Sequence, residues 1–295
     1  MNRDLVPLPN DAMRARRCPT MIFLLWAWEA TLGAAVAWPV ASIVRSAYGA
    51  HPRADAVLWE SGGFSLLDLL IRRLPEAGAL VAHVATVILF AAIAGLLPSA
   101  ALLVCLAFTT RERRTLRLSV AAQAAVVAFV PGAILLAVTL VFQGSLVVSA
   151  ATLAGLAREG FAPTLGDQRA DLSGLLLLTV GLLLAALAGV THDIARAAVV
   201  RFGAGAGEAL RLAVRAVAPG SLVLFWSWGW RALASLVLLA FGALLSERVG
   251  GRGGWALVTL FAVHQIIVGA RVAFRASWLA KAMRVVDHAG RPTSS

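Results

Sequence analysis

Charged side chains are scarce in this sequence. Only 14% of the 295 residues are charged, and 60% are hydrophobic. A soluble domain usually carries about 25% charged residues. This composition leaves too little polar surface for a soluble protein of this size. It therefore excludes the soluble classes and indicates a protein that crosses a membrane several times.

Lysine is almost absent as well. Lys281 is the only one, so the net charge of +11 rests on arginine. A basic balance is typical of nucleic-acid-binding proteins, but no soluble element here offers a face that could gather the charge. The arginines instead flank apolar runs, as they do at the cytoplasmic side of a membrane. The expected partner is the lipid bilayer, with anionic lipids at the inner leaflet, and no nucleic acid.

Residues of the common catalytic and metal sites are few. The two cysteines, Cys18 and Cys105, fit no metal motif, and the five histidines show no ligand spacing. Residues 203–207 read G-A-G-A-G, without the spacing of a dinucleotide loop or the Lys-Ser/Thr of a phosphate loop. No zinc-protease or serine-hydrolase motif occurs. The sequence thus predicts no cofactor and no metal, and favours a protein that is not an enzyme.

The dominant positive feature is a set of long apolar runs. Each reaches the roughly 20 residues that a spanning helix needs. We therefore expect an all-α, polytopic transmembrane helix bundle in the bacterial cytoplasmic (inner) membrane. The single domain, 21–280, lies between a basic N-terminal segment, 1–20, and a C-terminal tail, 281–295. The expected crossings are residues 21–44, 78–108, 118–143, 172–200, 220–245 and 254–280.

Both ends of the chain are predicted to be cytoplasmic. With six crossings, the side that holds both termini carries about twice as many Arg and Lys side chains as the other side. Two connecting segments have one apolar and one charged face. Residues 64–74 are expected to lie in the outer interface, and residues 208–217 on the inner leaflet.

The third apolar run is too long for one ordinary crossing. It continues from Leu118 to Ala157, roughly 60 Å as a helix. We expect a break at Gln143-Gly144-Ser145, after which residues 146–157 lie along the outer surface or re-enter the membrane. Kinks are expected at the prolines inside three of the runs, Pro39, Pro98 and Pro131.

Several ionisable residues fall inside or at the ends of the apolar runs, where charge is costly. These candidate site residues are Glu29, Asp193, Arg196, Arg231, Arg271 and Arg275. One interpretation pairs them internally, Glu29 with Arg231 and Asp193 with Arg271 or Arg196, so that they fix helix packing. The other notes two acids against four arginines, a surplus that could hold an anionic ligand or lipid headgroup.

Three of these features together resemble a known kind of protein. The fourth run ends in Asp193-Ile194-Ala195-Arg196, a small-residue linker and an arginine-bearing helix follow, and the last run carries Ala270-Arg271 through Arg275. This is similar to a broad group of uncharacterised six-helix bacterial inner-membrane proteins, loosely related to the membrane domain found with some glycerophosphodiester phosphodiesterases. The resemblance implies a fold and brings no established activity.

The sequence favours a non-catalytic scaffold or accessory subunit of a membrane complex, with a membrane-protein partner. The alternative is a transporter or permease component with an inward-facing, arginine-rich site for an anionic ligand or lipid headgroup. That alternative predicts a polar cavity reaching the midplane near Glu29, Arg231 and His264. An intramembrane enzyme would need a nucleophile and a base, or metal ligands, at a spacing that the sequence does not show.

Overall fold

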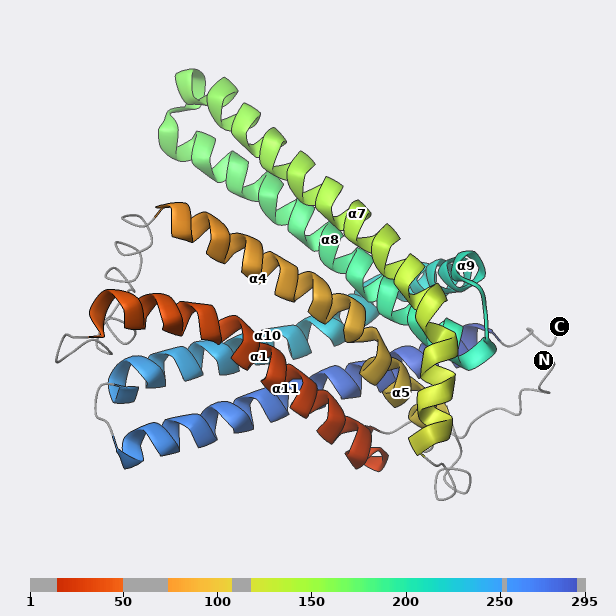
Figure 1. Cartoon of the computed structure of the whole chain (residues 1–295). Helices are drawn as coiled ribbons and strands as arrows, with labels where there is room; N and C mark the ends of the chain where they lie inside the picture. Colours follow the sequence, from red (N-terminus) through yellow and green to blue (C-terminus); the bar gives the residue numbers. More distant parts are fainter. Residues whose placement is uncertain (1–14, 50–73, 108–117, 251–253, 291–295) are drawn as a thin grey trace. The chain divides into compact units, whose positions relative to one another are not determined.

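The computed structural model describes residues 15–49, 74–107, 118–250 and 254–290. Every regular element in these ranges is helical, as the sequence predicts (Figure 1). Two short 3-10 turns, η1 (Ala15–Arg17) and η3 (Ala218–Gly220), accompany the α-helices. The α-helices are α1 (Pro19–Tyr48), α4 (Leu74–Ala94), α5 (Leu96–Ala107), α7 (Leu118–Leu165), α8 (Asp167–Phe202), α9 (Ala206–Val217), α10 (Ser221–Val249) and α11 (Trp255–Ala289).

Six helical segments of the described chain are long and apolar enough to cross a membrane, the number that the sequence predicts. They are Pro19–Pro39, Ala82–Ala107, Leu118–Thr164, Asp167–Phe202, Ala206–Val249 and Trp255–Ala289. The last helix continues to Ala289, well past residue 280 where the sequence predicts its crossing to end. The predicted outer interfacial helix, 64–74, lies outside the described residues except for Leu74, where α4 begins.

The described residues form two compact units. Unit 1 contains α7, α8, α9, the first part of α10 and the end of α11 from Leu279 onward. Unit 2 contains α1, α4, the start of α5, α10 from Gly229 and α11 up to Trp278. Each unit has its own packing and its own charged residues.

Helices α7 and α8 of unit 1 form a long antiparallel hairpin (Figure 1). The chain reverses at Gly166, whose φ of 79° lies in the left-handed region that glycine adopts without strain. Small residues line the seam between the helices. A β carbon on Gly181 would overlap that of Ala150, and one on Gly174 would lie 3.1 Å from the carbonyl oxygen of Ala154. The hairpin therefore closes because glycines let the two backbones approach.

The predicted break at residues 143–145 is wrong, because α7 is one uninterrupted helix of 48 residues. Two polar side chains there form hydrogen bonds within the hairpin. Gln143 Nε2 donates a hydrogen bond to the carbonyl of Ala185 on α8 (2.7 Å), and the Ser145 hydroxyl donates to the carbonyl of Phe142 (2.9 Å). A backbone in apolar surroundings keeps its own hydrogen bonds, and one glycine does not offset their loss.

Replacing Gln143 by leucine tests how much this cross-hairpin bond contributes. The variant keeps the side-chain volume but removes the donor, so we expect the free energy of unfolding to fall by about 0.5–1.5 kcal/mol. Titration of purified protein with sodium dodecyl sulphate, followed by circular dichroism, measures this change. An unchanged unfolding midpoint would mean that the bond to Ala185 does not stabilise the hairpin.

The pairing of α7 with α8 changes which part of α7 is expected to cross the membrane. Helix α8 has no charged residue between Asp171 and Asp193, a stretch of about 30 Å that matches the hydrocarbon thickness of a bilayer. Arg158 Nε of α7 lies 2.7 Å from Asp171 of α8, and Thr139 lies 3.1 Å from His192. The part of α7 beside this stretch is thus about 139–157, whereas the sequence predicts a crossing at 118–143.

In unit 2, a tryptophan of α1 packs against α4. The Trp28 ring packs against Phe90 of α4 with 6.1 Å between centroids, and its Nε1 lies 3.4 Å from the β position of Gly95. Gly95 separates α4 from α5, because Pro98 has no amide hydrogen to donate to the carbonyl of Ala94. Of the three predicted proline kinks, the one at Pro98 coincides with a helix end. Helices α1 and α7 continue through Pro39 and Pro131.

Candidate functional site

The charged residues that the sequence singles out fall into two groups, one in each unit. Asp193 and Arg196 belong to unit 1. Glu29, Arg231, Arg271 and Arg275 belong to unit 2.

Asp193 and Arg196 lie one turn apart near the end of α8. Every residue from His192 to Val199 is buried, so this part of α8 is covered on all sides. Asp193 Oδ1 lies 4.0 Å from Arg196 Nη1, and both side chains are less than one-tenth exposed. The two charges therefore compensate each other inside unit 1. This pairing is one of the two that the sequence suggests for Asp193.

His192 is buried beside this pair. Its Nδ1 lies 3.1 Å from the hydroxyl of Thr139 on α7, which itself donates to the carbonyl of Leu135. The ring thus joins α8 to α7 through one polar contact. A buried imidazole with a hydroxyl partner is a satisfied core side chain, and its geometry fits helix packing.

Sequence reasoning missed a buried ion pair of unit 1, which joins Arg201 of α8 to Asp287 of α11. The Arg201 Nε and Nη2 atoms lie 2.8 and 2.7 Å from Asp287 Oδ1, and the two side chains are 9% and 6% exposed. A β carbon on Gly290 would overlap the ring of Phe202, so the two helix ends also meet directly. Asp287 falls in the predicted tail, yet Leu279, Met283 and Val286 continue the apolar helical spacing and could have revealed it.

In unit 2, Glu29 of α1 lies within electrostatic range of Arg271 and Arg275, both on α11. The predicted partner, Arg231, is engaged differently. Its Nε and Nη2 atoms donate to the hydroxyl of Ser277 at 3.3 and 3.2 Å. The pairing of Glu29 with Arg231 stays a prediction, because it depends on how α10 and α11 are set against α1.

An aromatic ring stacks on the Arg231 guanidinium group. Its guanidinium carbon lies 4.5 Å from the centroid of the Trp230 ring, which meets Phe274 edge-on at 5.8 Å. Arginine often stacks in this way, and the contact adds roughly 0.5–1 kcal/mol where it is exposed. Arg231 is therefore held at the level of Ser277, about 9 Å along α11 from Arg271.

One buried polar atom of this cluster lacks a hydrogen bond. The Nε of Arg271 is buried and has no hydrogen-bond partner among the described residues. A buried donor of a charged group without an acceptor costs about 1–3 kcal/mol or more. Arg271 therefore carries an unsatisfied donor in the interior of unit 2.

His264 lies beyond the cluster on the same helix. Its Nδ1 donates to the carbonyl of Leu260 at 2.8 Å, and its Nε2 lies 3.2 Å from the hydroxyl of Ser246. Ser246 directly precedes the charged residues Glu247 and Arg248 near the end of α10. This contact places His264 level with the charged end of α10, whereas the sequence predicts a position close to the midplane of the membrane.

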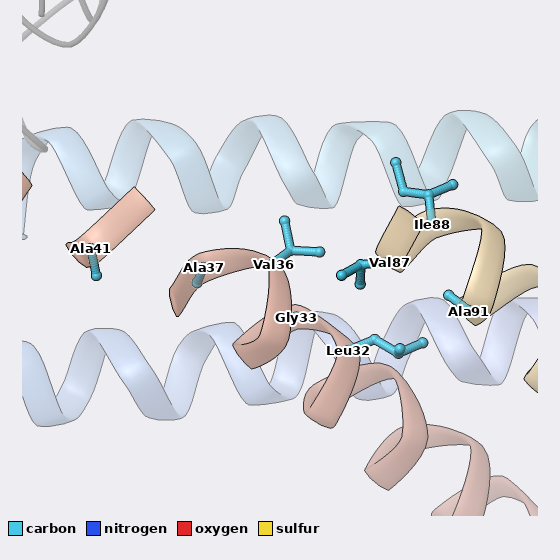
Figure 2. Close-up of a pocket in the computed structure, with 8 residues that line it drawn as sticks. All are labelled: Leu32, Gly33, Val36, Ala37, Ala41, Val87, Ile88 and Ala91. Carbon is cyan, nitrogen blue, oxygen red and sulfur yellow. The ribbon is translucent and has the colours of Figure 1, made fainter. Parts of the chain in front are cut away.

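An apolar groove of about 580 Å³ runs between α1 and α4 (Figure 2). Val36 of α1 and Val87 of α4 project into the space between the helices, and four of the lining residues are Gly or Ala. Its lining residues are Leu32, Gly33, Val36, Ala37, Ala41, Val87, Ile88 and Ala91. The groove therefore offers a long, nonpolar surface and no group for catalysis.

The site residues described above pair charges inside unit 1, and the groove offers space for an apolar chain. Within the ranges that the structure describes, no three His, Cys, Asp or Glu side chains gather as metal ligands. Compared with known proteins, the chain matches no protein-family model, no curated protein and no solved structure.

Proposed function

We propose that this chain is a multi-pass protein of the bacterial inner membrane that acts as a non-catalytic scaffold or accessory subunit of a membrane complex. The observation that carries the proposal is the buried Arg201–Asp287 pair, which ties α8 to α11. Asp193 and Arg196 form a second buried charge pair within α8. Buried ion pairs give specificity to packing more readily than they give net stability.

The proposed topology places both termini in the cytoplasm and follows from the distribution of arginine. It puts the turn at Gly166 on the outer side of the membrane. Helix α9 then lies at the inner leaflet, since Ala209, Ala213 and Ala216 are buried whereas Arg211 and Arg215 are exposed. Its exposed arginines would meet anionic headgroups there. The proposal also includes the fold of the six-helix inner-membrane proteins that the sequence resembles.

Cysteine accessibility in intact cells tests the scaffold against the transporter. In a background with Cys18→Ala and Cys105→Ala, we place a single cysteine at Ser235, a half-buried position one turn from Arg231. A dry interior predicts no reaction with a membrane-impermeant maleimide, because such a reagent needs water around the thiol. Thr164→Cys is the matched control at the exposed hairpin turn and should react fully from outside.

Labelling of Ser235→Cys as fast as Thr164→Cys would show a water-filled path, and the transporter interpretation would replace the scaffold. Reaction of the Ser235→Cys thiol after denaturation in sodium dodecyl sulphate confirms that it is competent. The scaffold proposal also requires a partner chain. Cross-linking at native expression levels should therefore join this chain to a different membrane protein, and cross-links only within or between copies of this chain would contradict it.

A further inference from the structure

His264 of α11 and Ser246 of α10 belong to a short chain of polar contacts inside unit 2. The Ser246 hydroxyl donates to the carbonyl of Gly242 at 2.8 Å, and the same hydroxyl lies 3.2 Å from His264 Nε2. The other ring nitrogen, Nδ1, lies 2.8 Å from the carbonyl of Leu260. Both side chains are half-buried. One imidazole ring therefore links α10 to α11 through this Ser246–His264 chain.

The hydrogens available in the chain decide which of its three contacts are hydrogen bonds. A backbone carbonyl only accepts, so the contact with Leu260 requires a hydrogen on Nδ1. A neutral imidazole carries one ring hydrogen, which leaves Nε2 as an acceptor. Ser246 has a single hydroxyl hydrogen, and that hydrogen serves either the Gly242 carbonyl or Nε2. A neutral His264 therefore forms two of the three hydrogen bonds at a time.

A second ring hydrogen completes the chain. When Nε2 also carries a hydrogen, it donates to the Ser246 oxygen, and the Ser246 hydroxyl is free to donate to Gly242. All three contacts are then hydrogen bonds at once, and the two that start from the charged ring are strengthened by its charge. The distances of the chain therefore match the protonated ring better than the neutral one.

The charged groups around the chain carry opposite signs. Glu247 and Arg248 directly follow Ser246 on α10, and both are exposed. On α11, the nearest charged residue along the sequence is Arg271, about 10 Å from His264 along the helix. Glu29 of α1 lies within electrostatic range of Arg271. Because each positive charge has a negative neighbour, the hydrogen bonds of the chain distinguish the two forms of the ring more than the surrounding charges do.

We propose that His264 is a proton-binding site, and that protonation of its ring strengthens the contact between α10 and α11. Helix α10 ends at Val249, about 5 Å along the axis from Ser246, so the site lies close to the helix end. An ordinary histidine titrates between about pH 5 and pH 8. The third hydrogen bond is therefore present at the acidic end of this range and lost as the pH rises. This makes the packing of unit 2 sensitive to pH, a property beyond the scaffold function.

Nuclear magnetic resonance of the full-length protein in detergent micelles, with 15N-labelled histidine, tests the count of ring hydrogens. The His264 signals are identified by their loss in His264→Gln or, should that variant not fold, in His264→Asn. The ring should carry a hydrogen on Nδ1 alone at about pH 8.5 and on both nitrogens at about pH 5.5, since these values lie on either side of the histidine range. A ring that stays neutral at the acidic pH would overturn the proposal, as would a neutral ring with its hydrogen on Nε2.

Unfolding titrations with sodium dodecyl sulphate at the same two pH values measure the coupling to helix packing. Relative to His264→Gln, whose amide does not titrate, the unmodified protein should gain about three- to tenfold in its folding equilibrium constant at the acidic pH, the size of one hydrogen bond. Ser246→Ala removes the acceptor of the Nε2 hydrogen and should abolish this gain, whereas Ser246→Thr keeps the hydroxyl and should retain it.

Ser235→Ala is the matched control on the same helix. Ser235 is also half-buried and donates to a carbonyl one turn earlier, that of Arg231, at 2.8 Å, so its loss should leave the gain unchanged. An acidic gain in Ser246→Ala as large as that of the unmodified protein would show that other groups cause the pH response, and the proposal would be wrong. The scaffold function is judged separately, by accessibility and cross-linking results that do not involve His264.

Discussion

Replacing Asp287 by leucine should lower the free energy of unfolding by about 3–5 kcal/mol, because it leaves the buried Arg201 guanidinium without its carboxylate. Both side chains are less than one-tenth exposed, and two guanidinium nitrogens converge on one oxygen of Asp287. A charge that is buried this far cannot recover its solvation in the folded state. The loss should appear as a lower midpoint in a detergent-unfolding titration.

The chain provides a matched control for this variant. Arg158 and Asp171 also approach to 2.7 Å, but their side chains are 66% and 55% exposed. Asp171→Leu should therefore change the free energy of unfolding by no more than about 1 kcal/mol. In addition, the double variant Arg201→Met with Asp287→Leu should recover most of the stability, since an apolar pair needs no charge compensation. Equal losses in Asp287→Leu and Asp171→Leu would show that burial does not set the strength of these pairs.

Gly181→Ala should destabilise the α7–α8 hairpin by about 1–3 kcal/mol, although alanine is intrinsically the better helix former. A β carbon at position 181 would overlap the β carbon of Ala150, so the helices must separate or bend. The change is measured by the same unfolding titration and by a lower melting temperature in detergent.

Two companion variants separate packing from helix propensity. Gly144→Ala lies on the same hairpin, where an added β carbon meets nothing within 4 Å, so this variant should be neutral or slightly stabilising. Ala150→Gly combined with Gly181→Ala moves the space to the other helix and should restore much of the loss. If Gly144→Ala were as harmful as Gly181→Ala, contact with Ala150 would not be the cause.

Local patterns in the sequence predicted the helices well. Apolar runs of sufficient length predicted six candidate crossings, and the Asp-x-x-Arg spacing at residues 193–196 suggested a pair on one helical face. Such features depend on residues that are near each other along the chain. The expected break at residue 144 failed because glycine was weighed by its propensity in water, whereas an apolar setting favours keeping every backbone hydrogen bond.

Features that depend on distant residues were predicted less well. The hairpin register is set by Gly174, Gly181 and Gln143, which act across two helices. The charged neighbours of Asp287 lower the local hydropathy, so the sequence predicts that the last crossing ends at residue 280, although α11 continues to Ala289. Helical spacing of apolar residues beyond a hydropathy boundary is the signal that would have extended it.

The uninterrupted length of α7 gives the hairpin a mechanical property. At 48 residues, it is a lever about 72 Å long, and the close seam along α8 makes the two helices turn together. A rotation of only 5° about one end would carry the other end roughly 6 Å, by the geometry of a rod of that length. Gly166 lies about 40 Å along α8 from the buried band around Asp193, so the same rotation about that band would move it by roughly 3.5 Å. A distance between paired spin labels would detect this movement.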